Sequence, residues 1–156
     1  MGKEETKLGH VKVESHLDEV EEAFSEQLAK AMIECSMQAV NFAKLAVAVD
    51  TGRLRNSITG AAGAARGGVV QTPANQDKVV TDGKGITKQS VMASPEDYKV
   101  LADPEDGVMA IGTNVEYAPS IELGTSTQSP KGFLGIALSE HMDLYKKIIE
   151  KNLRGE

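Results

Sequence analysis

Aromatic residues are scarce in this chain of 156 residues: they make up 4% of it, and tryptophan is absent. With so few aromatic side chains, the core must be built from Val, Ile, Leu, Met and Ala. Such a core packs modestly. A chain of this length is expected to form one domain, and its composition favours an oligomer over a very stable monomer.

Cysteine and long apolar runs are also lacking. The single cysteine, Cys35, excludes an internal disulfide, and its place among apolar residues indicates a buried, inert thiol. No apolar run has the length of a membrane span or a signal peptide, so we expect a chain that is cytosolic when synthesised. The histidines, His10, His16 and His141, are too widely spaced to indicate a metal site, and no cofactor is expected.

Positive charge does not predominate, because the net charge is -6. A general nucleic-acid binder needs clustered Lys and Arg, so DNA is not expected as a sequence-specific partner. Ser57 and Ser139 lack the Gly-x-Ser-x-Gly elbow of hydrolases, and there is no phosphate-binding loop signature. The sequence therefore predicts that the protein is not an enzyme. The loop from Gly124 to Ser129 could bind an anion, although a plain solvent loop is the favoured interpretation.

A long amphipathic helix is the first clear element. Ser15 and Asp18 form a variant of the capping box, and apolar residues then recur at steps of three and four from Val20 to Val49. The stripe spans about 30 residues, or roughly 45 Å, which exceeds the width of a small domain. A second stripe joins it in the C-terminal half and consists of Ile33, Met37, Val40 and Val47. It either lies deeper in the chain's own core or forms a subunit interface.

The helix is expected to end at Asp50, Thr51 and Gly52. Beyond it, alternating residues predict a first strand: Leu54, Asn56 and Ile58 on one face, and Arg55, Ser57 and Thr59 on the other. Arg53 and Arg55 are expected either to pair with an internal carboxylate such as Glu122 or to contact an acidic surface of a neighbouring subunit.

Residues 60–106 are rich in Gly, Ala and turn formers, which predicts a long flexible arm. Val69-Val70 and Val79-Val80 are brief strand signals, and Asp82-Gly83 is a plausible hairpin tip. Ser94 is expected to begin a short helix that ends at about Leu101.

The stretch after this arm has narrow conformational requirements. Val108 to Ile111 predicts a buried strand, and Tyr117 to Leu123 a helical turn with Pro119 near its start and Gly124 at its end. Tyr117, Ile121 and Leu123 are expected to cover the end of the sheet. A second amphipathic helix is predicted from Phe133 to Leu153, beside the first helix, with this apolar side: Leu134, Leu138, Met142, Tyr145, Ile149 and Leu153.

The predicted fold class is therefore α+β: a long N-terminal helix and a C-terminal helix packed on a small, mainly antiparallel sheet. Residues 1–14 are expected to be a flexible N-terminal segment, with an edge strand at Val11 and Val13 and disorder over the first eight residues. Residues 15–156 are expected to form a single domain with the arm 60–106 inserted.

Three short motifs resemble a known family. Asp50-Thr-Gly-Arg-Leu-Arg-Asn-Ser-Ile58, Tyr117-Ala-Pro-Ser-Ile-Glu-Leu-Gly-Thr125 and Gly132-Phe-Leu-Gly-Ile-Ala-Leu138 occur in the order seen in the tail-component family of tailed bacteriophages and prophages. The resemblance covers roughly residues 17–60 and 107–152. Gly132 and Gly135 stand where that family usually has proline, and the proline often found before the first motif is missing.

The resemblance implies a structural virion protein, specifically a tail-completion or head-tail joining component located in the neck or tail and assembled in the host cytoplasm. It further implies a homo-oligomeric ring, commonly sixfold, between portal or connector and tail-tube proteins, through which DNA passes. The motif residues implied are Asp50, Thr51, Gly52, Arg53, Leu54, Arg55, Tyr117, Ala118, Glu122, Gly124, Thr125 and Phe133. A tail terminator and a small cytosolic anion-binding module are the alternatives.

Overall fold

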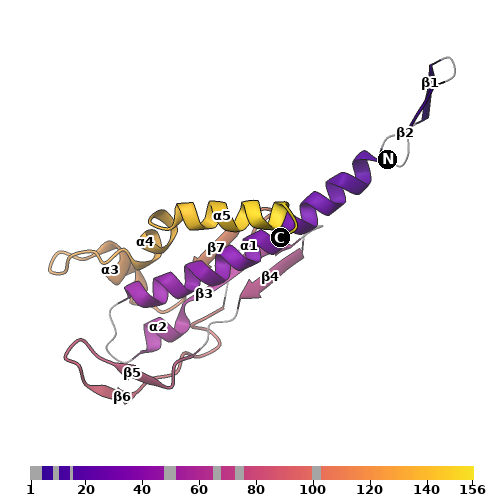
Figure 1. Cartoon of the computed structure of the whole chain (residues 1–156). Coiled ribbons are helices and arrows are strands. Elements are labelled where there is room, and N and C mark those ends of the chain that lie inside the picture. The colour runs from indigo at the N-terminus through magenta and orange to yellow at the C-terminus, as the bar shows by residue number, and fades with distance from the viewer. Residues whose placement is uncertain are drawn as a thin grey trace.

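The structure, a computed structural model, describes residues 5–8, 11–14, 16–47, 52–64, 68–72, 76–99 and 103–156 (Figure 1). The elements are β1 (Glu5–Leu8), β2 (Val11–Glu14), α1 (Leu17–Ala46), α2 (Arg53–Ser57), β3 (Thr59–Ala64), β4 (Gly68–Thr72), β5 (Val79–Thr81), β6 (Thr87–Gln89), β7 (Met109–Gly112), α3 (Ala118–Leu123), α4 (Phe133–Ser139) and α5 (Met142–Leu153). The predicted α+β class, with a long N-terminal helix, is confirmed.

The central sheet is antiparallel, with strand order β4-β3-β7. Its middle strand, β3, consists of Thr, Gly and Ala alone, and both Ala61 and Ala62 are fully buried. A Cβ atom on Gly60 would lie 2.3 Å from the Ser36 Oγ of α1. The small residues therefore let α1 pack directly on the strand backbone.

This arrangement corrects the start of the arm predicted over residues 60–106, because residues 60–64 belong to the most buried strand of the sheet. The Gly and Ala side chains of this segment are individually too small to form a core, which is why the sequence predicted an arm. In fact the bulk is supplied by α1, and β3 contributes a surface that the helix can approach. The β4 and β5 strands predicted at Val69-Val70 and Val79-Val80 are confirmed.

The remainder of the range forms a hairpin and a turn. β5 and β6 pair antiparallel around a tip in which the Asp82 carboxylate accepts the Lys84 and Ile86 amides, so the predicted tip is correct. The Asn56 side chain ties this region to α2, since its amide donates to the Asp77 carbonyl at 3.2 Å. Around residues 95–98 the chain forms turns where a helix was predicted, and residues 100–102 lie outside the described ranges.

The predicted first strand is wrong over residues 53–57, which form α2. Gly52 has φ 87°, a left-handed conformation that starts the turn, and the Asn56 amide donates to the Gly52 carbonyl at 2.9 Å. Ser57 Oγ also donates to the Leu54 carbonyl at 2.6 Å. A run of five residues is too short for its apolar pattern to distinguish the period of a strand from that of a helix, and these local hydrogen bonds favour the helix. The strand begins at Thr59.

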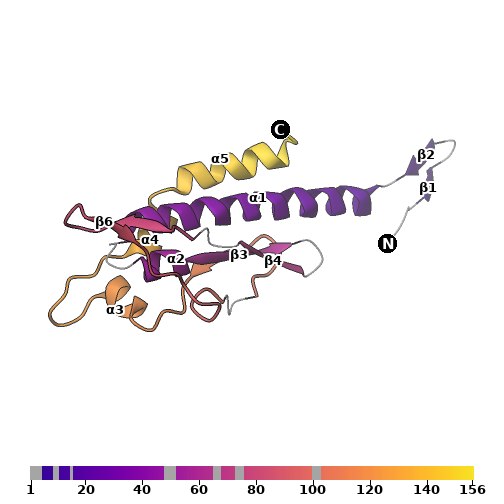
Figure 2. The ribbon, with the colours of Figure 1, turned by 90° about the horizontal axis from the view of Figure 1, so that it is seen from below.

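The predicted C-terminal helix is two helices, α4 and α5, separated at Glu140 and His141. The His141 ring stacks on Phe42 of α1, with ring centroids 3.5 Å apart. The break rotates the apolar face: Phe133, Ala137, Tyr145 and Ile148 are buried, whereas Met142 is 51% exposed. In Figure 2, α5 lies along α1 on the side away from β3 and β4.

The two halves of α1 differ in burial. Its C-terminal half lies in the core, where Ala31, Cys35 and Ala39 of the predicted stripe are buried. Its N-terminal half extends beyond the body of the molecule (Figures 1 and 2), and Val20 and Phe24 of the same stripe are exposed.

The second stripe on α1 was proposed as a candidate subunit interface, and the structure assigns most of it to the chain's own core. Val40 is 3% and Val47 is 4% exposed, in one core cluster with residues from α2, α3 and α4. Ile33 is half-buried against the cluster between α1 and α5, while Met37 is exposed. Val40 and Val47 are therefore unavailable to a neighbouring subunit.

At the N-terminus, β1 and β2 form a two-stranded antiparallel hairpin. The strand expected at Val11 and Val13 is present, and residues 5–8, expected to be disordered, pair with it. The predicted capping residue Ser15 lies outside the described residues.

Candidate functional site

The three sequence motifs come together at the C-terminal end of α1 (Figure 1). Leu54 of the first motif, Ala118 of the second and Phe133 of the third are all buried in one cluster. They pack around Val40 of α1 and Val47, the residue that follows α1. Segments about 60 and 80 residues apart in sequence therefore build one unit, which we call the motif unit.

Arg53 joins this unit through its charge. Its guanidinium donates to both Asp97 oxygens, at 3.0 and 2.8 Å, and to both Glu116 oxygens, at 3.0 and 3.1 Å. The Tyr117 ring lies 5.9 Å from Arg53 Cζ, within the range of a cation–π contact. A planar fork that binds two carboxylates fixes the position of α2 relative to the segments before β7 and α3.

The prediction that Glu122 pairs with Arg53 or Arg55 is therefore wrong, although an internal role for Arg53 is correct. Asp97 and Glu116 were not identified from the sequence, since nothing local distinguishes them from the other acidic residues. Arg55 instead lies beside Asp77, with Nε 3.1 Å from Oδ2, as an ion pair whose alignment falls short of a hydrogen bond.

The contacts around Arg53 shift the pKa values of the three groups that make them. Hydrogen bonds from Arg53, and then from the Ser94 amide, lower the pKa of Asp97 to about 2 and outweigh the effect of its burial. The Asp97 side chain is 7% exposed. Arg53 also lowers the pKa of Glu116, and the two carboxylates raise the pKa of Arg53. All three groups are charged at neutral pH and are committed to one another.

Glu122 acts as a cap for a neighbouring helix. Its carboxylate accepts the Leu134 amide at 2.9 Å and the Gly135 amide at 3.0 Å, both in the first turn of α4. Amides at a helix start have no partner within the helix, and a negative charge there is favourable. Glu122 thus links the second motif to the third.

The segment around Gly124 also has a structural explanation. Gly124 has φ 78°, and a Cβ there would lie 2.7 Å from the Pro130 nitrogen, so only glycine fits the exit of α3 as predicted. Thr125 Oγ1 accepts the Thr127 and Gln128 amides at 3.3 and 3.1 Å. Those two amides are engaged within the loop, which weakens the anion-binding interpretation.

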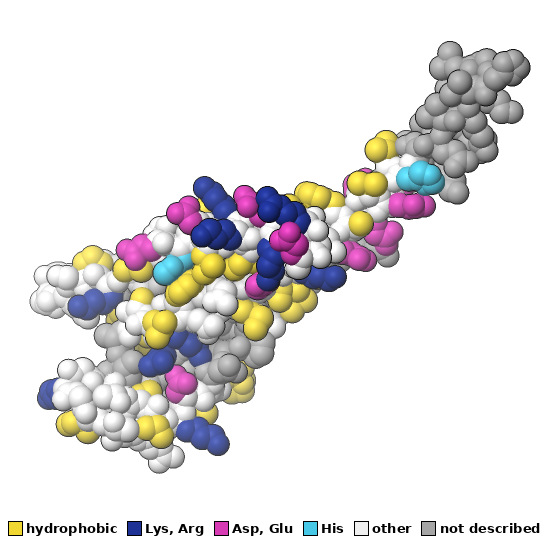
Figure 3. Space-filling view, in the orientation of Figure 1, with side chains coloured by type: hydrophobic (Ala, Val, Ile, Leu, Met, Phe, Trp, Pro, Cys, Tyr) yellow, Lys and Arg dark blue, Asp and Glu magenta, His cyan; other side chains and the backbone are white. Residues whose placement is uncertain are grey.

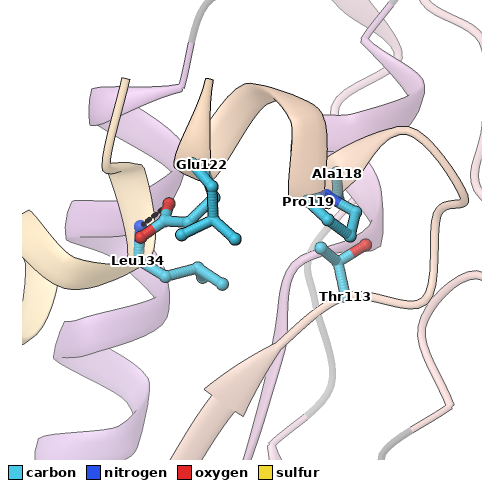
Figure 4. A pocket seen from close by; sticks show the side chains of 6 residues that line it. Thr113, Ala118, Pro119, Glu122 and Leu134 are labelled. Atoms are coloured by element: carbon cyan, nitrogen blue, oxygen red, sulfur yellow. Dashed lines mark hydrogen bonds between the residues drawn. The ribbon is translucent and has the colours of Figure 1, made fainter. Parts of the chain in front are cut away.

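An open pocket of about 250 Å³ lies between α3 and α4 (Figure 4). Its lining is mainly apolar and comprises Thr113, Ala118, Pro119, Glu122, Leu123 and Leu134. Leu123, expected to cover the end of the sheet, is 76% exposed at its rim, whereas Tyr117 and Ile121 do pack against the core. Ligand pockets usually measure roughly 300–1,000 Å³, so this one suits a single apolar side chain better than a nucleotide.

The Cys35 thiol and the Ser57 hydroxyl are both buried. Burial raises the pKa of the Cys35 thiol to about 11, and its Sγ points to the Tyr145 carbonyl at 3.8 Å. Ser57 is fully buried. Within the ranges that the structure describes, no group of three or more His, Cys, Asp or Glu could hold a metal ion, and no helix there is long and apolar enough to cross a membrane. Asp50 and Thr51 of the first motif lie outside these ranges.

No protein-family model, curated protein or solved structure matches this chain.

Proposed function

We propose that this chain is a structural protein of a tailed phage or prophage particle. It acts as a tail-completion or head-tail joining component, and it functions by assembling with copies of itself into a ring. Six copies per ring is the number implied by the resemblance of its motifs. Its work is binding to neighbouring proteins of the neck or tail, with no chemical turnover.

The observation that carries the proposal is how the motif residues are used. Arg53 ties α2 to Asp97 and Glu116, Glu122 caps α4, and Phe133 fills the core. These described motif residues are thus used to maintain one shape. This arrangement is what a building block requires, because its neighbours recognise a fixed surface.

A second observation supports self-assembly. The N-terminal half of α1 carries exposed Leu17, Val20 and Phe24 at helical spacing, away from the body of the molecule. An apolar stripe on a projecting helix is costly to leave in water, and contiguous apolar surface of this kind marks interaction sites.

The test begins with the oligomeric state. Sedimentation velocity and native mass spectrometry of the full chain, over a hundredfold range of concentration, are expected to give one closed species, seen as rings by negative-stain electron microscopy. A monomer at every concentration would contradict the proposal. If that monomer were also stabilised by a phosphate compound in a thermal-shift assay, the anion-binding alternative would be correct.

A second measurement separates the two phage roles. Rings mixed with purified tails and with DNA-filled heads are expected to bind at the head-tail junction and to increase joining. Rings that bind the ends of tail tubes but never heads would instead identify a tail terminator.

A further inference from the structure

We infer that the exposed face of α1 formed by Leu17, Val20 and Phe24, here called the α1 face, docks on the β5–β6 hairpin of a second copy of this chain. The inference depends on the self-assembly proposed above and names the two surfaces that make the contact.

The α1 face is apolar and uncovered. Leu17, Val20 and Phe24 are 74%, 64% and 54% exposed, at spacings of three and four residues that place them on one side of the helix. Two turns further along, the same stripe continues into Ala31 and Cys35, which are buried beneath α5. The N-terminal half of α1 therefore repeats a pattern that is covered elsewhere on the same helix.

The surroundings of the α1 face are strongly acidic. Residues 17–26 contain no Lys or Arg and carry these acidic side chains: Asp18, Glu19, Glu21, Glu22 and Glu26. In Figure 3 the acidic side chains on the projecting part of α1 lie beside its hydrophobic ones. Two α1 faces packed against each other would bring these like charges together, which is unfavourable. The partner surface should therefore be apolar and basic.

The β5–β6 hairpin has those two properties. Val79 and Ile86 are 58% and 57% exposed, and Lys78 and Lys84 are exposed as well, whereas Lys88 pairs with Asp82, with Nζ 3.7 Å from Oδ2. Its inner face is anchored to the body, where Val80 is 3% exposed and lies close to Gly52. The opposite face of the strands carries Val79 and Thr81 and is left for another surface, with Lys84 at the tip of the hairpin beside it.

The hairpin also has a structural need for a partner. β5 and β6 pair with each other and, among the described strands, with no third one. A two-stranded hairpin of three residues per strand is marginally stable in water and requires packing on its faces. One face packs on the body, so a helix laid on the outer face would complete a sandwiched hairpin.

The positions of the two surfaces fit a ring. The projecting end of α1 and the β5–β6 hairpin lie at opposite ends of the molecule (Figure 1). A contact between two different surfaces of identical chains is heterologous, and it propagates from copy to copy, as a ring where the rotation closes and as an open filament where it does not. A self-complementary contact would stop at a dimer.

Charge reversal tests the contact directly. The helix variant carries Glu21→Lys and Glu22→Lys, and the hairpin variant carries Lys78→Glu and Lys84→Glu. The hairpin variant then has two acidic surfaces, and the helix variant replaces two of the five acidic residues within 17–26 by lysines that face a basic hairpin, so each alone is expected to need about tenfold more protein for half-assembly. An equimolar mixture of the two variants is expected to assemble again, as a ring in which the two variants alternate.

The matched control reverses charge on another basic surface, Lys146→Glu with Lys147→Glu on α5, and is expected to leave assembly unchanged. Circular dichroism and thermal unfolding establish that every variant is folded. Full assembly of the folded hairpin variant would overturn the inference, and so would loss of assembly in the α5 variant with none in the hairpin variant. If the wild type still forms a ring in these cases, only the inferred contact is wrong. A monomeric wild type would contradict the proposed function itself.

Discussion

The two halves of α1 carry the same apolar periodicity and end in different environments. From Leu28 to Ala39 the stripe is packed between α5 and the sheet, while Leu17, Val20 and Phe24 are exposed to solvent. Periodicity thus identifies a face of a helix that will be covered, and it does not identify what covers it. In the C-terminal half the cover is the chain itself. In the N-terminal half we propose that it is another copy.

The largest expected effect compares one residue type in both settings. Phe133 is fully buried in the motif unit and Phe24 is 54% exposed. Phe133→Ala is expected to lower the free energy of unfolding by about 4 kcal/mol, because it removes core contacts and leaves a cavity. Phe24→Ala, measured by urea unfolding at concentrations where the chain is dissociated, should cost less than about 0.5 kcal/mol. Equal losses would show that the two regions are not distinct.

The contact between α1 and β3 can be tested with a smaller change. Gly60→Ala places a Cβ 2.3 Å from Ser36 Oγ, 3.1 Å from Val40 Cγ2 and 3.3 Å from the Ala110 carbonyl oxygen, so the Ser36 side chain or α1 itself must shift. The expected cost in unfolding free energy is about 2 kcal/mol. Gly83→Ala in the β5–β6 tip is the control, since no atom lies within 4 Å of its Cβ position. A neutral Gly60→Ala would contradict the close approach.

The cap on α4 is expected to contribute less. Glu122→Ala leaves the Leu134 and Gly135 amides without their acceptor, which should cost about 1 kcal/mol in urea unfolding. Glu122→Gln keeps one acceptor oxygen and is expected to recover part of that loss. If both variants match the wild type, the carboxylate does not stabilise the motif unit.

The smallest effect is a dependence on acid. The pKa of Asp97 is lowered from 3.8 to about 2 in the folded state, so its carboxylate stabilises the fold above 3.8, and that stabilisation is lost as the pH falls through about 2. Urea midpoints measured across this window should fall less steeply in Asp97→Asn than in the wild type. Phe24→Ala, which lies far from Arg53, should keep the wild-type slope.

Much of the fold follows from local sequence. The α1 helix, the β7 strand and the α3 turn ending at Gly124 were predicted because an apolar period, a β run or a glycine marked each one. The break between α4 and α5 was missed because no local signal marks it; at the break His141 stacks on Phe42, a contact between residues about 100 positions apart. β3 was missed because its glycines and alanines form a buried strand only through the close packing of α1 on them, which the local sequence does not show.

The candidate site was predicted less completely. The motifs identified Arg53 and Glu122 as important, and both have specific roles, but their partners were assigned wrongly. Glu122 binds amides that lie 12 and 13 residues further along the chain, and Arg53 binds Asp97 and Glu116, 44 and 63 residues away. A guanidinium can pair with any carboxylate, so only the tertiary fold determines the choice.

The most direct test of the account is a cross-link between copies. A chain with Cys35→Ala, Phe24→Cys and Ile86→Cys is oxidised under assembling conditions and examined by non-reducing electrophoresis and peptide mass spectrometry. The account predicts disulfides between position 24 of one copy and position 86 of the next, forming a ladder of covalent oligomers, and none with either cysteine alone. An assembled chain that gives only links between two copies of position 24, or no links, would contradict it.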